Sequence, residues 1–146
     1  MFRLINIMKK YLFIGISYLL LSSFGNNETI YYPVSIVELI ANSKQFADSS
    51  ISFNGFLVYD FEHKAIYLSS ESAKNYIFKN AIQLETDTNT VWSSTKGRKV
   101  NKEKIRFGQP VLVVGVYKPP KSRPLYDFYS GTIVARKVQL VDWIVL

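Results

Sequence analysis

The stretch from Ile51 to Ser69 constrains the fold of this chain more than any other. Its first half alternates apolar and polar residues with a period of two, which is typical of a strand with one buried face. Gly55 interrupts the alternation and predicts a long strand that coils sharply or bulges to change partners. The segment from Asp60 to Lys64 is short and polar, and an apolar run follows at 65–68, so the two strands are expected to form a hairpin.

Two short helices are expected beside this hairpin. Ser35 and Glu38 form a capping-box pattern, so a helix is predicted to begin after Ser35. Its apolar side is predicted to consist of Val37, Ile40 and Ala41. A second helix of one or two turns is predicted over 70–78, with Ser70 as its cap.

Three more strands are predicted after the hairpin. The segment 81–85 alternates between apolar and polar residues, and 111–117 is apolar on both faces, which predicts a central, covered strand. A last strand is expected over 132–143, and its alternation slips near Arg136–Lys137, which predicts a bulge. The polar segment 86–104 is expected to be a long mobile connection.

This order of elements resembles the OB-fold, a five-stranded Greek-key barrel, although no helix is evident between the third and fourth strands. The expected class is therefore mainly β, with one or two short helices. The sequence is also similar to a family of uncharacterised bacterial exported OB-like proteins. The segments that carry this similarity are Val34–Asn42, Ser52–Leu57, Ala65–Leu68, Lys79–Ala81 and Tyr129–Ile133. The resemblance implies a fold and an exported location, and it brings no established catalytic residues.

Residues 1–25 have the pattern of a signal peptide. Arg3, Lys9 and Lys10 precede an uncharged, mostly apolar run that is shorter than the roughly 20 residues of a membrane span. Small residues at Ser23 and Gly25 predict cleavage there, which leaves 26–146 as a single OB-like domain; an uncleaved anchor is the alternative. Because the chain has no cysteine, neither disulfides nor a lipidated N-terminus is expected. We therefore expect a secreted or periplasmic product with no stable membrane span in its mature part.

Positive charge gathers in the second half of the sequence. The chain has a formal net charge of +7, and nine Lys or Arg residues lie between Lys96 and Arg123 against the single acid Glu103. Such an asymmetry predicts a positive surface that could meet an anionic partner. The alternative is a solvated loop that keeps the protein soluble.

The residues needed for catalysis or for metal binding are sparse. His63 is the single histidine and cysteine is absent, so a cysteine nucleophile is excluded and a histidine-based triad has one candidate. Asp60, Glu62 and His63 are close together, but neighbouring residues of a turn are ordinarily hydrated rather than metal-bound. We therefore expect no enzyme, no cofactor and no metal.

Ligand binding by an OB-like face is the favoured function. Such barrels bind along the second and third strands, between the loop joining the first two strands and the loop joining the last two. Aromatic residues in these elements could stack on a ligand, and cations could hold its charges. The candidate contacts are Tyr59, Phe61, Tyr67, Tyr117, Lys118, Lys121, Arg123, Tyr126, Phe128 and Tyr129. For each aromatic residue the alternative role is packing within a small barrel.

The sequence thus predicts an exported binding module for an anionic or oligomeric ligand. A protein-interaction or immunity-type inhibitor is the second candidate, and an enzyme is the third. Nucleic acid is a chemically reasonable ligand for an OB-like face, but the expected export disfavours it as the natural partner.

Overall fold

The computed structural model describes residues 29–121 and 128–141. The predicted signal peptide, Arg123, Tyr126 and the end of the predicted last strand lie outside these residues. Within them, no helix is both long enough and apolar enough to span a bilayer.

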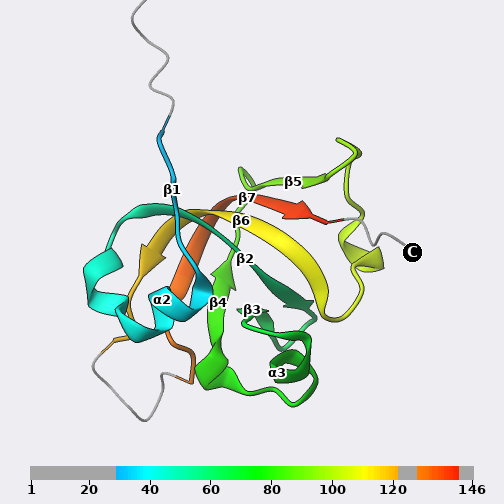
Figure 1. The fold of residues 1–146 in the computed structure, drawn as a ribbon. Coiled ribbons are helices and arrows are strands. Elements are labelled where there is room, and N and C mark those ends of the chain that lie inside the picture. Colours follow the sequence, from blue (N-terminus) through cyan, green and yellow to red (C-terminus); the bar gives the residue numbers. More distant parts are fainter. Residues whose placement is uncertain (1–28, 122–127, 142–146) are drawn as a thin grey trace, which may run out of the picture. The chain divides into compact units, whose positions relative to one another are not determined.

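Five strands close into a barrel (Figure 1). They are β2 (Ser50–Tyr59), β3 (Lys64–Tyr67), β4 (Ala81–Glu85), β6 (Gln109–Lys118) and β7 (Thr132–Leu140). β3 pairs with both β2 and β4, β4 pairs in parallel with β7, and β6 joins β7 back to β2. Because this ring has the strand order of the OB-fold, the predicted fold class is confirmed.

Gly55 lies where β2 acquires a second partner. Residues 50–57 of β2 pair with β6, and residues 56–59 pair with β3. A Cβ atom at Gly55 would clash with Cγ2 of Ile66 and would lie 2.9 Å from the carbonyl oxygen of Tyr67. The register with both strands is continuous, so the glycine allows a close approach and no bulge is present here.

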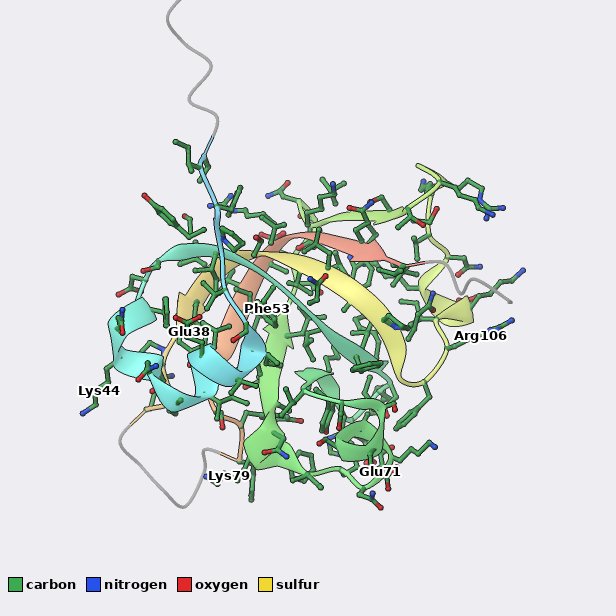
Figure 2. All side chains as sticks on the ribbon, in the orientation of Figure 1. Glu38, Lys44, Phe53, Glu71, Lys79 and Arg106 are labelled. Carbon is green, nitrogen blue, oxygen red and sulfur yellow. The ribbon has the colours of Figure 1, made fainter. Side chains whose placement is uncertain are left out.

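The bulge predicted near Arg136 is present. Val114 of β6 is opposite Lys137, whereas Gly115 is opposite Ala135, so Arg136 is the extra residue of β7. β6 is central, with β2 on one edge and β7 on the other. The barrel interior contains Phe53, Leu57, Val113 and Ile133, all of which are fully buried or nearly so; Figure 2 labels Phe53.

Both predicted helices exist, with corrected details. α2 (Ile36–Ala41) begins after Ser35, whose hydroxyl accepts a hydrogen bond from the backbone N–H of Glu38. Its buried residues are Ile36 and Leu39, so the prediction of an apolar side at Val37, Ile40 and Ala41 was wrong, except that Ile40 packs at the edge of the core. α3 (Ser70–Lys74) is shorter than predicted, and its cap is Ser69.

The segment 86–104 is not the unstructured connection predicted from its polarity. It contains β5 (Val91–Ser94), which pairs in parallel with residues 137–140 of β7. β4 uses the same edge of β7 at residues 132–134, so β5 continues this edge where β4 has ended. Shorter elements complete the fold: β1 (Tyr32–Pro33) and the 3₁₀ turns η1 (Ser43–Phe46), η2 (Phe78–Asn80) and η3 (Lys102–Lys104).

Candidate ligand groove

A groove of about 560 Å³ lies over β3 and β4, the second and third strands of the barrel. Its wall combines aromatic rings with polar side chains from the turn before β3, from η2, from β4 and from the segment before β7. The residues that line it are Phe61, Glu62, His63, Lys64, Phe78, Gln83, Leu84, Phe128 and Tyr129. Its size falls within the range of small-ligand sites, and it occupies the face that OB-folds use for ligands.

Aromatic rings contact one another along this groove. The imidazole ring of His63 contacts Tyr76 and Phe78, with centroid distances of 5.3 and 5.5 Å, and these two rings contact each other at 6.3 Å. Phe78 in turn contacts Tyr129 at 5.3 Å and Phe128 at 6.1 Å. The contacts continue beyond the groove from Tyr76 to Phe107 at 5.8 Å. We call these six residues, Phe107, Tyr76, His63, Phe78, Phe128 and Tyr129, the aromatic strip.

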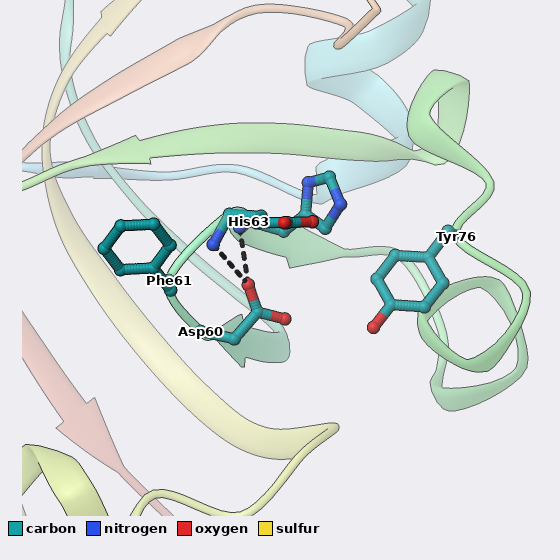
Figure 3. Close-up of a pocket in the computed structure, with 5 residues that line it drawn as sticks. Asp60, Phe61, His63 and Tyr76 are labelled. Atoms are coloured by element: carbon teal, nitrogen blue, oxygen red, sulfur yellow. Dashed lines mark hydrogen bonds between the residues drawn. The ribbon is translucent and has the colours of Figure 1, made fainter.

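The hairpin turn forms one end of the groove, and Figure 3 shows this turn in an adjoining pocket, which it lines together with Tyr76. A carboxylate oxygen of Asp60 accepts hydrogen bonds from the backbone N–H groups of Glu62 and His63, which fixes the turn. Phe61 projects from the turn and is 99% exposed. Because the Asp60 carboxylate is occupied in holding the turn, its observed role is structural.

Tyr67 lies beneath the groove, on the outer side of β3. Its ring packs in a small second core with Ala65, Ala73 and Ala81, and Phe78 and Tyr129 pack against that core. Its hydroxyl group is buried and has no hydrogen-bond partner among the described residues. Burial raises the pKa of Tyr67, and the neighbouring Tyr129, Tyr76 and Asp60 raise it further.

The structure brings three of the ten predicted contacts together. Phe61, Phe128 and Tyr129 line the groove. Burial and, to a smaller extent, the nearby Asp60 raise the pKa of the Tyr129 hydroxyl. The side chains of these three residues reach the groove from the two loops that the sequence predicted to flank it.

Other predicted contacts lie elsewhere. Tyr67 and Tyr117 are fully buried, so neither ring is available at the surface. The Tyr117 hydroxyl donates a hydrogen bond to the carbonyl oxygen of Ser130 at 2.7 Å. Tyr59 packs edge-on against Trp92 at 5.1 Å, away from the groove. Lys118 and Lys121 are exposed and do not line the groove, while Arg123 and Tyr126 lie outside the described residues.

Sequence reasoning missed Phe78 and Gln83 as groove residues. Phe78 was expected within a helix, but α3 ends at Lys74, and Tyr76 then adopts a left-handed backbone conformation with φ of 49°. Gln83 is the polar member of the alternation in β4, so its outward direction could have identified it. His63 was considered as a catalytic or metal-binding residue. Its ring contacts with Tyr76 and Phe78 could not be predicted, because these residues are distant from it in the sequence.

A second pocket, of about 570 Å³, lies beside β5 and η3. We call it the basic pocket, and its lining residues are Ser94, Lys96, Arg98, Lys99, Val100, Asn101, Lys104, Arg106, Gln109 and Leu140. It contains five of the nine Lys and Arg residues between Lys96 and Arg123, a stretch that we call the basic segment. The remaining described ones lie elsewhere: Lys102 is placed over the Trp92 ring at 5.0 Å, and Lys118 and Lys121 follow the far end of β6. Within residues 29–121 and 128–141, no group of three acidic or histidine side chains is arranged to hold a metal ion.

The ring of strands and the groove on β3 and β4 define the class of protein: a mainly β, OB-like barrel with an added strand beside β7. No protein-family model and no curated protein sequence matches the chain. Among solved structures, it is similar to a DUF3299 family protein from Pseudomonas aeruginosa PAO1, with a TM-score of 0.42 and 13% identity, over 69% of this chain and 66% of that one. It is also similar to a putative aspartyl-tRNA synthetase from Leishmania major Friedlin, with a TM-score of 0.47 and 11% identity, over 83% of this chain and 22% of that one.

Proposed function

We propose that this chain is an exported, non-enzymatic binding module that holds an uncharged oligosaccharide in the groove over β3 and β4. The observation that carries the proposal is the composition of that groove. Phe61, Phe78 and Phe128 offer apolar ring faces, and Glu62, Lys64 and Gln83 offer donors and acceptors beside them. Sugar rings have one apolar face and a rim of hydroxyl groups, so both kinds of contact are needed to hold them.

The charge of the groove favours a neutral oligosaccharide over an oligonucleotide, the other kind of ligand that OB-folds commonly bind. Binding of a phosphate backbone requires a positive groove, because neutralisation of phosphates supplies most of the affinity. Lys64 is the one Lys or Arg among the described residues that line the groove, and Glu62 offsets its charge. The cations of the basic segment that the structure describes line the basic pocket or lie outside both sites. The groove therefore favours a neutral polymer.

The test uses cellotetraose, a neutral oligosaccharide, as the probe and amide chemical shifts of the labelled protein as the readout. We expect shifts at residues 61–64, 78–84 and 128–130, with no systematic shifts at 94–106. Phe128→Ala should weaken binding about tenfold or more, because a stacked ring contributes roughly 1–3 kcal/mol. Tyr32→Ala is the matched control, since Tyr32 is also an exposed aromatic residue and does not line the groove.

Two results would contradict the proposal. Shifts confined to residues outside the groove would place the site elsewhere, and equal losses in both variants would show that the ring stacking is not specific. A panel of neutral oligosaccharides with other linkages guards against an unsuitable choice of probe. If no member of the panel shifts the groove resonances, the oligosaccharide proposal fails.

A protein partner is the second candidate, and the length of the aromatic strip favours it. Tyr76 and Phe107 lie at the end of the strip beyond the groove, and 38% and 48% of their respective surfaces are exposed. Contiguous exposed rings of this kind are typical of protein interfaces. The variant Phe107→Ala separates the candidates, since the ring of Phe107 contacts Tyr76, which is not among the described residues that line the groove. It should leave cellotetraose binding within about twofold, but it should weaken a protein complex centred on the strip.

A further inference from the structure

We propose that the basic pocket is a second, separate binding site that takes an acidic polysaccharide. The side chains of Lys96, Arg98, Lys99, Lys104 and Arg106 converge on it, and none of the described residues that line it is acidic. Within the described parts of the chain, none of these five cations forms an ion pair. Glu103, the one acid in this part of the sequence, does not line the pocket. Five positive charges around one concave surface raise the local concentration of an anionic chain.

The backbone that carries these cations is held in place on both sides. Two backbone hydrogen bonds close the turn after β5. The N–H of Gly97 donates to the carbonyl oxygen of Ser94 at 2.9 Å, and the N–H of Ser94 donates to the carbonyl oxygen of Arg98 at 3.1 Å. The N–H of Thr95 donates to the carbonyl oxygen of Leu140 in β7 at 3.0 Å. These bonds fix Lys96, Arg98 and Lys99 relative to the barrel, which lowers the entropy that binding would otherwise cost.

The other wall of the pocket is anchored by apolar contacts. Val100 and Ile105 pack against the main core on either side of η3. The N–H of Arg106 donates to the side-chain oxygen of the buried Gln109 at 3.3 Å. Lys104 and Arg106 are therefore presented by an ordered segment and not by a solvated loop. The guanidinium groups of Arg98 and Arg106 can each hold a sulfate, phosphate or carboxylate with two parallel hydrogen bonds.

The absence of aromatic side chains decides which kind of polyanion fits. Proteins that hold single-stranded nucleic acid combine a positive groove with rings on which the bases stack. No described residue that lines the basic pocket is aromatic. Phe107, which follows Arg106, contacts Tyr76 in the aromatic strip, and the ring of Trp92 packs against Tyr59 with Lys102 over it. The pocket therefore suits a chain that carries anionic groups without bases, which is the chemistry of an acidic polysaccharide.

The test compares two variants with the same change in net charge. The site variant is Lys96→Gln/Lys99→Gln/Lys104→Gln, and the control is Lys44→Gln/Lys118→Gln/Lys121→Gln, in which every replaced lysine is also exposed. Figure 2 shows Lys44 on the opposite side of the barrel from Arg106, whose side chain lines the pocket. The probe is a labelled heparin octasaccharide, and its affinity is measured over a series of salt concentrations.

We expect the wild type and the control variant to bind heparin with the same salt dependence. The site variant should lose affinity, and its slope of log affinity against log salt should flatten by roughly two units, because each lost contact to a flexible polyanion removes about 0.7. Amide shifts on addition of heparin should map to residues 94–106 in the wild type. The site variant should still bind cellotetraose, since the basic pocket and the groove have no described lining residue in common.

Three outcomes would overturn the proposal. Equal losses in both variants would show that heparin responds to net charge, and no binding by the wild type at low salt would show a merely solvated surface. Tighter binding of a single-stranded oligothymidine of equal charge would show that the site prefers nucleic acid. If the groove bound no oligosaccharide, the proposal for the basic pocket would be unaffected, so the experiments test the two proposals independently.

Discussion

The hydroxyl groups of two buried tyrosines, Tyr67 and Tyr117, are expected to have opposite effects on the stability of this fold. The Tyr117 hydroxyl donates to the carbonyl oxygen of Ser130, whereas the Tyr67 hydroxyl is buried without a partner among the described residues. An unpaired buried donor costs free energy because it has lost water without gaining a protein partner. We therefore expect Tyr67→Phe to raise the free energy of unfolding by up to about 1 kcal/mol and Tyr117→Phe to lower it by about 1–2 kcal/mol.

Chemical denaturation of both variants measures these changes, and each serves as the control for the other because the change of atoms is identical. The opposite signs are the essential part of this prediction. A loss of stability in Tyr67→Phe comparable to that in Tyr117→Phe would show that the Tyr67 hydroxyl has a partner in solution, such as an ordered water molecule.

The residues at the groove also show what sequence patterns leave open. Phe61, Phe128 and Tyr129 could be predicted because they lie in the loops that flank the ligand face of an OB-like barrel. Tyr67 and Tyr117 could not be distinguished from surface residues in the same way, because a tyrosine tolerates both a buried and an exposed position. Their burial depends on the segments that cover them, which only the tertiary fold determines.

At the scale of single elements, the start of α3 tests whether its cap has been identified correctly. Ser69 and Ser70 are adjacent serines, and the sequence predicted the second as the cap. In the structure the Ser69 side chain accepts a hydrogen bond from the backbone N–H of Ser72 at 3.0 Å and donates one to the Ser72 hydroxyl. Ser70 is exposed, within the first turn.

We therefore expect Ser69→Ala to lower the free energy of unfolding by about 1 kcal/mol, since a lost cap leaves a helix N–H group unpaired. Ser70→Ala is the matched control and should change the stability by less than about 0.5 kcal/mol. Thermal or urea denaturation gives both values. The reverse order of effects would show that the helix begins one residue later in solution.

The long hydrophobic strands could be predicted from sequence, whereas the short polar ones could not. β2, β6 and the bulge of β7 follow from alternation and its interruptions, which are local properties. β5 has four residues, of which two are serines, and it exists because residues 137–140 of β7 offer it an unpaired edge. This edge is available only because β4 ends after pairing with Val134. Such a strand depends on contacts far apart in sequence.

At the scale of the whole molecule, the barrel separates two kinds of surface. The groove lies over β3 and β4, whereas the basic pocket lies beside β5 and η3, at the start of β6. The sequence places nine cations in one segment, but β6, roughly 30 Å long if measured along its ten residues, leaves Arg106 before its start and Lys118 at its end. One basic region of the sequence therefore becomes two surfaces in the fold, and this division could not be seen before the strand pairing was known.

The stability of the whole barrel should also depend on pH in the alkaline range. Burial raises the pKa of Tyr117 to about 12, and burial likewise raises the pKa values of Tyr67 and Tyr129 above the ordinary value of about 10. The folded state therefore favours the neutral phenols, while the unfolded chain releases their protons from about pH 10 upward. The stabilisation is fully present below pH 10 and is lost as the pH rises towards 12.

We expect the urea midpoint of unfolding to fall between about pH 10 and pH 12 in the wild type. In the double variant Tyr67→Phe/Tyr117→Phe the fall should be shallower, because two of the three groups that release protons on unfolding have been removed. The variant Tyr31→Phe/Tyr32→Phe is the control, since it removes two tyrosines that lie outside the barrel interior and should keep the wild-type slope. Equal slopes in the wild type and in the Tyr67→Phe/Tyr117→Phe variant would mean that other groups cause the alkaline transition, and that these two phenols ionise in the folded state as easily as in the unfolded one.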